Sequence, residues 1–248
     1  MCGKKQAGFT IIETMLFLGI TGLIMSFMLV GVGSQLNHRR YQDASSSLRS
    51  YVQSQYNFVS SVNSSRAKGE KCVGNKITPD DGTNFDTAIG TSDCTIVGRL
   101  LRSINDGAGI SSTPVIATVN AAVLPLGQGD PDVKVLQDAK LVLGLLPENY
   151  DAQWGTKLVK PSPDNAMPAT FSVLIVRMPT TGVIHTYVSN QANISPHNLV
   201  AAAGNTADFK LCLDPMGLLG GASQPAGTLI RANAANTSGI DYISQGGC

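Results

Sequence analysis

The chain has 248 residues, enough for one domain or two, and only 14% of them are charged. Soluble proteins usually carry about 25% charged residues, and the formal net charge here is +1. The total charge therefore gives no long-range attraction to nucleic acid, and we predict no direct nucleic-acid binding. Uncharged polar residues replace the missing charges, a composition common in exported proteins.

The amino-terminal segment is one long apolar run. Residues 9–33 contain a single charged side chain, Glu13, and as a helix they would cross a hydrocarbon core of about 30 Å with some tilt. A cleavable secretory signal fits poorly, because its apolar region spans only about 7–15 residues. Lys4 and Lys5 precede the run, so we predict a single-pass segment with a cytoplasmic amino terminus and the carboxyl terminus outside.

The helix is expected to continue beyond the membrane over residues 34–69. Residues 34–66 contain neither Pro nor Gly, and Gly69 is a suitable stop signal. Apolar residues recur there at spacings of three and four, which predicts an amphipathic helix packed on a partner. The members of this stripe are Leu48, Val52, Tyr56, Val59 and Val62.

The start of the apolar run has a specific order. Basic residues precede the sequence AGFTIIE (residues 7–13), and a long apolar stretch follows it. This order resembles the processing site of type IV prepilins and the related pseudopilins. The resemblance implies that prepilin peptidase cuts between Gly8 and Phe9, removes residues 1–8 as a leader and methylates the new amine of Phe9. Residues 9–33 would then remain as a transmembrane and assembly helix.

The resemblance also implies that Glu13 acts in assembly. Phe9 and Glu13 are four residues apart and share a helix face, so the new amine and the carboxylate can neutralise each other within a chain or between subunits. An acid inside a membrane costs about 2.5–3.5 kcal/mol, and an opposite charge at about 4 Å contributes about 4 kcal/mol at an effective dielectric constant of about 20. The two energies nearly cancel, so the pair contributes little stability. Its main effect would be to set the register between neighbouring subunits, because the carboxylate is neutralised only when an amine lies at the same height. A plain anchor with an accidental acid is the alternative.

Residues 70–248 are expected to form an extracytoplasmic globular head. Residues 72–98 predict a loop region. Residues 94–101, which overlap its end, also fit the start of a strand or a short helix. Residues 114–126 are rich in Val and Ala, and their secondary structure is ambiguous. A helix is predicted over residues 131–145, where Asp130 would be the cap and Pro131 would lie in the first turn. Residues 146–168 predict a loop. Its aromatic residues Tyr150 and Trp154 would either be exposed and contact a partner protein or pack against the head beneath the loop.

The clearest strand signal lies in the carboxyl-terminal third of the chain. Residues 171–177 and 183–188 predict two strands joined by a turn at residues 179–182, and residues 209–213 and 228–231 add two more. An antiparallel sheet of about four strands would cover the apolar stripe of the helix. This order of elements matches the pilin-like α+β fold that the resemblance implies, with residues 99–165 as a candidate insertion.

Five cysteines are present, and loss of a leader that carries Cys2 would leave four. An exported protein with Cys72, Cys94, Cys212 and Cys248 is expected to form two disulfides, with three possible connectivities. Sequence proximity favours Cys72–Cys94 and Cys212–Cys248, each worth about 3–4 kcal/mol in the chain-entropy model. A zinc site is disfavoured because the chain has no CxxC pair.

No catalytic motif is recognisable. The chain has no Gly-x-Ser-x-Gly elbow and no phosphate-binding Gly-Lys-Ser/Thr loop. The acidic pairs Asp80-Asp81 and Asp130-x-Asp132 do not continue into a calcium loop. We therefore predict no enzyme, no metal site and no cofactor. The three histidines are scattered: His38, His185 and His197.

Taken together, these features predict a structural subunit: a major pilin, a minor pilin or a pseudopilin of a type IV pilus or a related type II secretion or DNA-uptake filament. Its expected partners are prepilin peptidase, other pilin subunits and the membrane, with a cell-surface location after assembly. The alternative is a filament-borne or membrane-anchored adhesive module that uses the head, residues 70–248.

Overall fold

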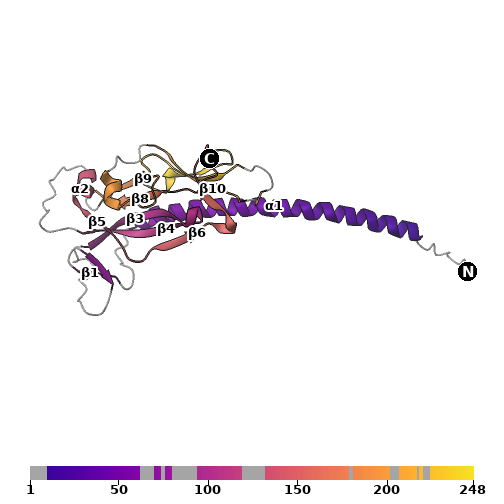
Figure 1. Ribbon diagram of the computed structural model, residues 1–248, viewed down its shortest axis with the longest axis horizontal. Coiled ribbons are helices and arrows are strands. Elements are labelled where there is room, and N and C mark those ends of the chain that lie inside the picture. Colours follow the sequence, from indigo (N-terminus) through magenta and orange to yellow (C-terminus); the bar gives the residue numbers. More distant parts are fainter. Residues whose placement is uncertain are drawn as a thin grey trace, which may run out of the picture.

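The computed structural model describes residues 10–61, 70–73, 76–79, 94–118, 132–178, 181–201, 207–216, 218–219 and 224–248. One helix of 50 residues, α1 (Ile11–Ser60), projects from a head built of antiparallel sheets (Figure 1). The prediction of an α+β protein with a long amino-terminal helix is therefore confirmed.

Both ends of α1 have caps. At its start the Oγ1 of Thr10 accepts a hydrogen bond from the backbone N–H of Glu13 at 3.3 Å, which closes the first turn. At its end Arg177 donates from Nη1 to the carbonyl of Ser60 at 2.8 Å, and a cation is favourable at a helix carboxyl terminus. The predicted continuation to residue 66 and the stop at Gly69 lie outside the described ranges.

The strands that the structure describes form three sheets. The largest has the order β5-β4-β3-β8-β9, with β6 also paired to β4; the second has the order β12-β11-β10-β7, and β1 pairs with β2. The strands are β1 (Glu70–Val73), β2 (Lys76–Pro79), β3 (Cys94–Ile104), β4 (Gly109–Thr118), β5 (Lys140–Leu143), β6 (Glu148–Asp151), β7 (Lys157–Val159), β8 (Ser172–Arg177), β9 (Ile184–Ser189), β10 (Phe209–Asp214), β11 (Ala226–Ile230) and β12 (Ile240–Ile243). Two short helices, α2 (Asp132–Asp138) and α3 (Pro196–Ala201), and three 3-10 turns, η1 (Asn105–Gly107), η2 (Gln153–Gly155) and η3 (Thr237–Gly239), complete the described elements.

The four strands predicted in the last third of the chain are all present. β8 pairs with β9, and β10 pairs with β11, each antiparallel. The prediction of one sheet of about four strands is wrong, because the two pairs belong to different sheets. Residues 179–180 of the predicted turn are not among those described.

The region between the helix and β8 holds most of the corrections. The helix predicted over residues 131–145 ends at Asp138, and β5 then pairs with β4. The loop predicted over residues 146–168 contains β6, η2 and β7. The ambiguous residues 94–101 are strand, and so are residues 114–118. Residues 72–98 include parts of β1 and β3 and all of β2, instead of a loop alone.

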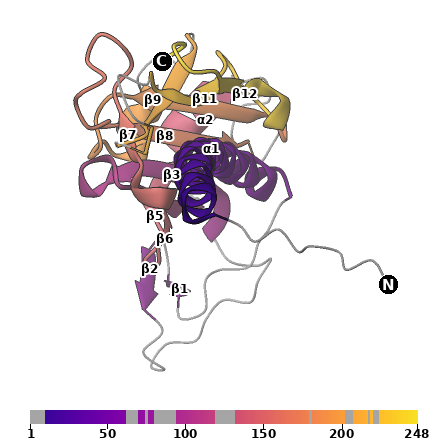
Figure 2. The ribbon, with the colours of Figure 1, turned by 90° about the vertical axis from the view of Figure 1, so that its right-hand side faces the viewer.

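The second half of α1 lies between the two large sheets (Figure 2). Leu48 and Val52 are fully buried in a core cluster with side chains from both sheets, among them Val173 of β8 and Leu211 of β10. The opposite face of the six-stranded sheet is covered by α2 and α3. Both faces of this sheet are therefore buried, which explains why it shows no alternating pattern in the sequence.

Two disulfides tie the head together. Cys72 of β1 is bonded to Cys94 at the start of β3, with their Cα atoms 6.1 Å apart. Cys212 of β10 is bonded to Cys248, with a Cα separation of 5.7 Å. Of the three possible connectivities, the structure has the one that sequence proximity favours.

Candidate functional site

The first half of α1 is apolar and uncovered. The segment is long and apolar enough to cross a membrane, and its most apolar window has none of its residues buried within the molecule. Large exposed apolar side chains lie on all sides of this half: Ile11, Ile12, Met15, Leu16, Phe17, Leu18, Ile20, Leu23, Ile24, Met25, Phe27, Met28, Leu29, Val32 and Leu36.

Glu13 lies in the first turn of α1, exposed among these apolar side chains. The Thr10-x-x-Glu13 spacing is that of a capping box, in which the N-cap hydroxyl accepts from the backbone N–H three residues on. That bond is present, and the sequence reasoning missed it although the spacing was visible. Gly8 and Phe9, the expected cleavage and methylation residues, lie outside the described ranges.

Hydroxyl side chains of this half form hydrogen bonds to backbone carbonyls of the same helix. Thr14 donates to the carbonyl of Ile11 at 2.9 Å, and Thr21 donates to that of Phe17 at 2.8 Å. Ser26 donates to Gly22 at 2.9 Å. Such bonds remove the need for water or a partner in lipid. No other charged residue occurs between Ile11 and His38, so Glu13 is the group in this span that still needs a partner.

Tyr41 fixes the point where α1 enters the head. Its hydroxyl donates to the carbonyl of Leu213 in β10 and accepts from the backbone N–H of Ala226 in β11, each at 2.6 Å. Tyr41 is 1% exposed. One helix side chain thus satisfies backbone groups of two neighbouring strands of the four-stranded sheet.

Tyr56 forms the corresponding bond to the other large sheet. Its hydroxyl lies 2.8 Å from Oγ1 of Thr186 in β9. Thr186 donates in turn to the carbonyl of Ala234 at 2.7 Å, so Tyr56 is the donor in the first bond. Together the two tyrosines fix the rotation of α1 against the head.

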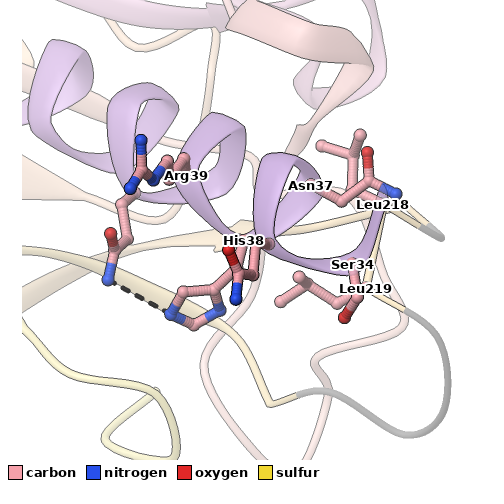
Figure 3. Close-up of a pocket in the computed structure, with 8 residues that line it drawn as sticks. Ser34, Asn37, His38, Arg39, Leu218 and Leu219 are labelled. Atoms are coloured by element: carbon pink, nitrogen blue, oxygen red, sulfur yellow. Dashed lines mark hydrogen bonds between the residues drawn. The ribbon is translucent and has the colours of Figure 1, made fainter. Parts of the chain in front are cut away.

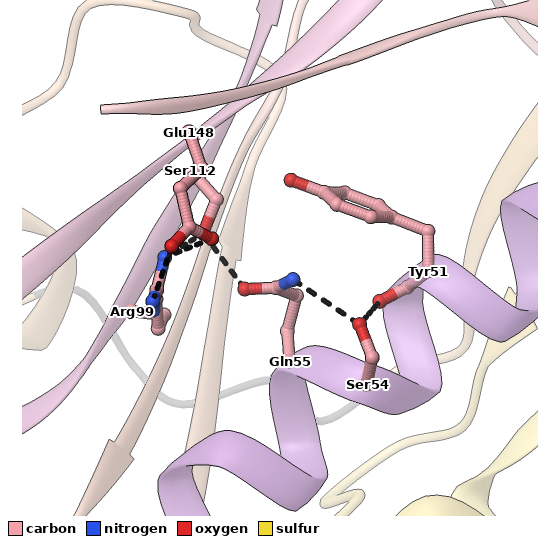
Figure 4. Close-up of polar contacts among 6 residues, drawn as sticks. All are labelled: Tyr51, Ser54, Gln55, Arg99, Ser112 and Glu148. Carbon is pink, nitrogen blue, oxygen red and sulfur yellow. Dashed lines mark hydrogen bonds and ion pairs between the residues drawn. The ribbon is translucent and has the colours of Figure 1, made fainter. Parts of the chain in front are cut away.

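A polar network links α1 to three strands (Figure 4). Gln55 accepts from Oγ of Ser112 in β4 at 2.8 Å, and that hydroxyl accepts from Arg99 of β3 at 3.3 Å. Arg99 is 4% exposed, and its guanidinium forms an ion pair with Glu148 of β6 at 2.8 Å. It also lies 4.0 Å from the ring centre of Phe58. The buried charge is therefore paired and hydrogen-bonded through both Nη atoms, which offsets much of the cost of burial.

The buried tyrosines predict that the head loses stability in alkali. Burial raises the pKa of Tyr41 to about 12 and that of Tyr56 to about 12, from 10.0. The unfolded chain loses these protons first, so stability is retained below pH 10 and falls between about pH 10 and 12, by up to about 1.4 kcal/mol per pH unit for each tyrosine. Denaturant titrations in detergent at increasing pH should show this slope, and Tyr56→Phe should make it shallower; equal slopes would contradict the assignment.

A groove lies where the exposed half of α1 meets the head (Figure 3). Its volume is 860 Å³, and it is open to solvent. The Nε2 of His38 lies 3.1 Å from Nε2 of Gln42 within it. The lining residues are Ser34, Gln35, Asn37, His38, Arg39, Gln42, Leu218 and Leu219.

Within the described ranges, no group of three or more His, Cys, Asp or Glu side chains could hold a metal ion. Asp80, Asp81 and Asp130 fall outside those ranges. His185 lies in β9 and His197 in α3, far from His38 in the sequence. Among the residues that the structure describes, these candidates form no common metal site.

Comparison with known proteins finds no matching family model, no matching curated protein and no matching solved structure.

Proposed function

We propose that the protein is a pilin-like structural subunit, held in a membrane by the first half of α1 and assembled into a filament through that helix. The observation that supports this most directly is the division of one continuous helix. Large apolar side chains are exposed along the described part of α1 from Ile11 to Leu36, whereas Tyr41, Leu48, Val52 and Tyr56 are buried against two antiparallel sheets. A helix with those two halves has one surface for the head and another for lipid or neighbouring helices.

The sequence AGFTIIE supports processing at its glycine. In this proposal prepilin peptidase cuts after Gly8, residues 1–8 leave as the leader, and Phe9 becomes a methylated terminus. Its amine then meets Glu13 of a neighbouring subunit. The head lies outside the cytoplasmic membrane, where its two disulfides can form and persist, and it reaches the cell surface with the filament.

Intact mass of protein isolated from membranes tests the proposal. The expected mass lacks residues 1–8, carries one added methyl group and shows four thiols oxidised to two disulfides. Gly8→Val is expected to leave the leader in place, because the peptidase must fit the residue before the cut. Gly3→Ala is the matched control and should be processed normally. Mature protein that still begins at Met1 would exclude this function.

A deletion strain distinguishes a building block from an adhesive head. Loss of filaments in electron micrographs is expected for a structural subunit. Filaments that persist while attachment is lost would instead assign the binding function to residues 70–248.

A further inference from the structure

Two bulky residues have a left-handed backbone. Among the described non-glycine residues with positive φ, three are Asn or Asp, the types that tolerate this region. The other two are Trp154, with φ 58°, and Met216, with φ 48°. For large side chains this conformation is strained, and strain of this kind tends to gather at functional positions.

Both residues are at turns and both stay in solvent. Trp154 is 51% exposed and Met216 is 52% exposed, although each is a side chain that normally packs inside. The β6 and β10 strands that precede the two turns lie at the end of the head from which α1 emerges (Figure 1). Leu218 and Leu219, just after Met216, line the groove beside α1. We call Trp154, Met216, Leu218 and Leu219 the basal collar.

Contacts with α1 fix the position of Trp154. Its Nε1 donates to Oδ2 of Asp43 at 3.0 Å, and the guanidinium carbon of Arg40 lies 5.1 Å from its ring centre. The arrangement leaves half of the indole exposed. Two guanidinium groups, those of Arg39 and Arg40, stand against the single carboxylate of Asp43 on this turn of the helix, so its formal charge is positive.

The groove contains part of this positive charge. Arg39 and His38 line it together with polar and leucine side chains, and none of the described lining residues is acidic (Figure 3). A concave site with a guanidinium, an imidazole and amide donors suits a phosphate group. The leucines on its other wall suit the apolar chain next to such a phosphate in a phospholipid.

The position of the collar along the axis of α1 corresponds to the headgroup layer of a bilayer. Leu36 is the last large exposed apolar residue of the run, at 47% exposed, and would mark the edge of the hydrocarbon core. Arg40 lies four residues farther, about 6 Å along the axis. The headgroup layer is about 5–8 Å thick on each side of the core. Trp154, which contacts Arg40, is thus expected within that layer, where tryptophan is enriched.

We propose that the basal collar docks the head onto the outer headgroup layer of the membrane, with His38 and Arg39 binding the phosphate of an anionic phospholipid. The inference rests on the proposed membrane insertion of α1. It adds a defined resting position for the head before assembly. Continuity of the collar with the apolar run and the local positive charge favour lipid over a protein partner.

Fluorescence of the full-length protein in vesicles tests this directly, because Trp154 is its only tryptophan. Vesicles of phosphatidylcholine and phosphatidylglycerol are made with or without bromine on the acyl carbons nearest the headgroup. We expect bromine to lower the emission at least about twofold, as for an interfacial indole. Unquenched emission in vesicles that retain the protein after an alkaline carbonate wash would overturn the docking surface alone. Loss of the protein in that wash would overturn the proposed insertion as well.

Two variants separate docking from mere proximity. Met216→Asn removes an apolar side chain yet suits the left-handed backbone, and it should reduce the quenching. Arg39→Gln should lower the ratio of quenched to unquenched tryptophan about fivefold. This is the change in binding expected when one cation near an anionic membrane surface is lost. Lys140→Gln, in β5 of the head, is the matched control and should change nothing. Equal quenching in the parent protein and all three variants would overturn the proposal. Protection of Trp154 from quenching that rises with the protein-to-lipid ratio would also overturn it, because it would show that another copy of the chain covers the collar.

Discussion

Glu13→Gln is expected to abolish incorporation into filaments while the protein remains folded, cleaved and inserted. The substitution keeps the size of the side chain and removes its charge. The helix start does not depend on the carboxylate, because the cap uses Oγ1 of Thr10 and the backbone N–H of residue 13. The loss therefore concerns the pairing with a terminal amine. The substitution removes an attraction of about 4 kcal/mol together with the cost of about 2.5–3.5 kcal/mol of an acid inside the membrane, so what is lost is mainly the interaction that sets the register between neighbouring subunits.

The measurement is the amount of protein in sheared filaments relative to the amount in membranes, by immunoblot and electron microscopy. Ser26→Ala serves as the control, since the hydroxyl of Ser26 bonds to Gly22 of its own helix. It should assemble normally. Filaments formed by Glu13→Gln in the parental amount would remove the reason for an acid in the apolar run.

Leu48→Ala is expected to lower the free energy of unfolding of the head by about 2–5 kcal/mol. Leu48 is 0% exposed in the core cluster that joins α1 to both sheets, so truncation leaves a cavity that the rigid sheets cannot close. The melting temperature should fall by roughly 5–15 °C for a domain of this size. Near-ultraviolet circular dichroism in detergent would follow the transition.

Leu29→Ala is the matched control on the same helix. Leu29 is 74% exposed, so its truncation should change stability by less than about 0.5 kcal/mol. Equal effects of the two substitutions would mean that the second half of α1 is not part of the head's core. The contrast between them is a direct measure of the two-part helix on which the proposed function rests.

Local patterns predicted part of the fold. α1 was predictable because its apolar stripe has the helical period, and four of the five stripe residues are buried, with Val62 outside the described ranges. β8 and β9 were predictable because two β-rich runs flank a short turn. By contrast β3 has no alternation, since adjacent Leu100 and Leu101 are both 0% exposed on opposite faces of a covered sheet.

Pairing partners explain the wrong assignments. Residues 140–143 look helical from their neighbours in the chain, yet they form β5 because β4 offers its edge. The bonds of Tyr41 join residues 172 and 185 positions apart. No pattern among neighbouring residues in the sequence predicts these contacts. The same holds for the contacts that link Arg99 to α1 and β6.

The sequence by itself determined the apolar run, its lone carboxylate, the helix that extends it and a set of cysteines able to form two disulfides. These follow from composition and from spacing along a few turns of chain. Only the tertiary structure decided that two large sheets pack against the second half of α1 and that Tyr41, Tyr56 and Arg99 hold it there. The position of the two strained turns, near its exit from the head, was likewise decided only by the tertiary structure. Those features depend on side chains and backbone groups far apart in the chain, whose contact is set by packing and strand pairing.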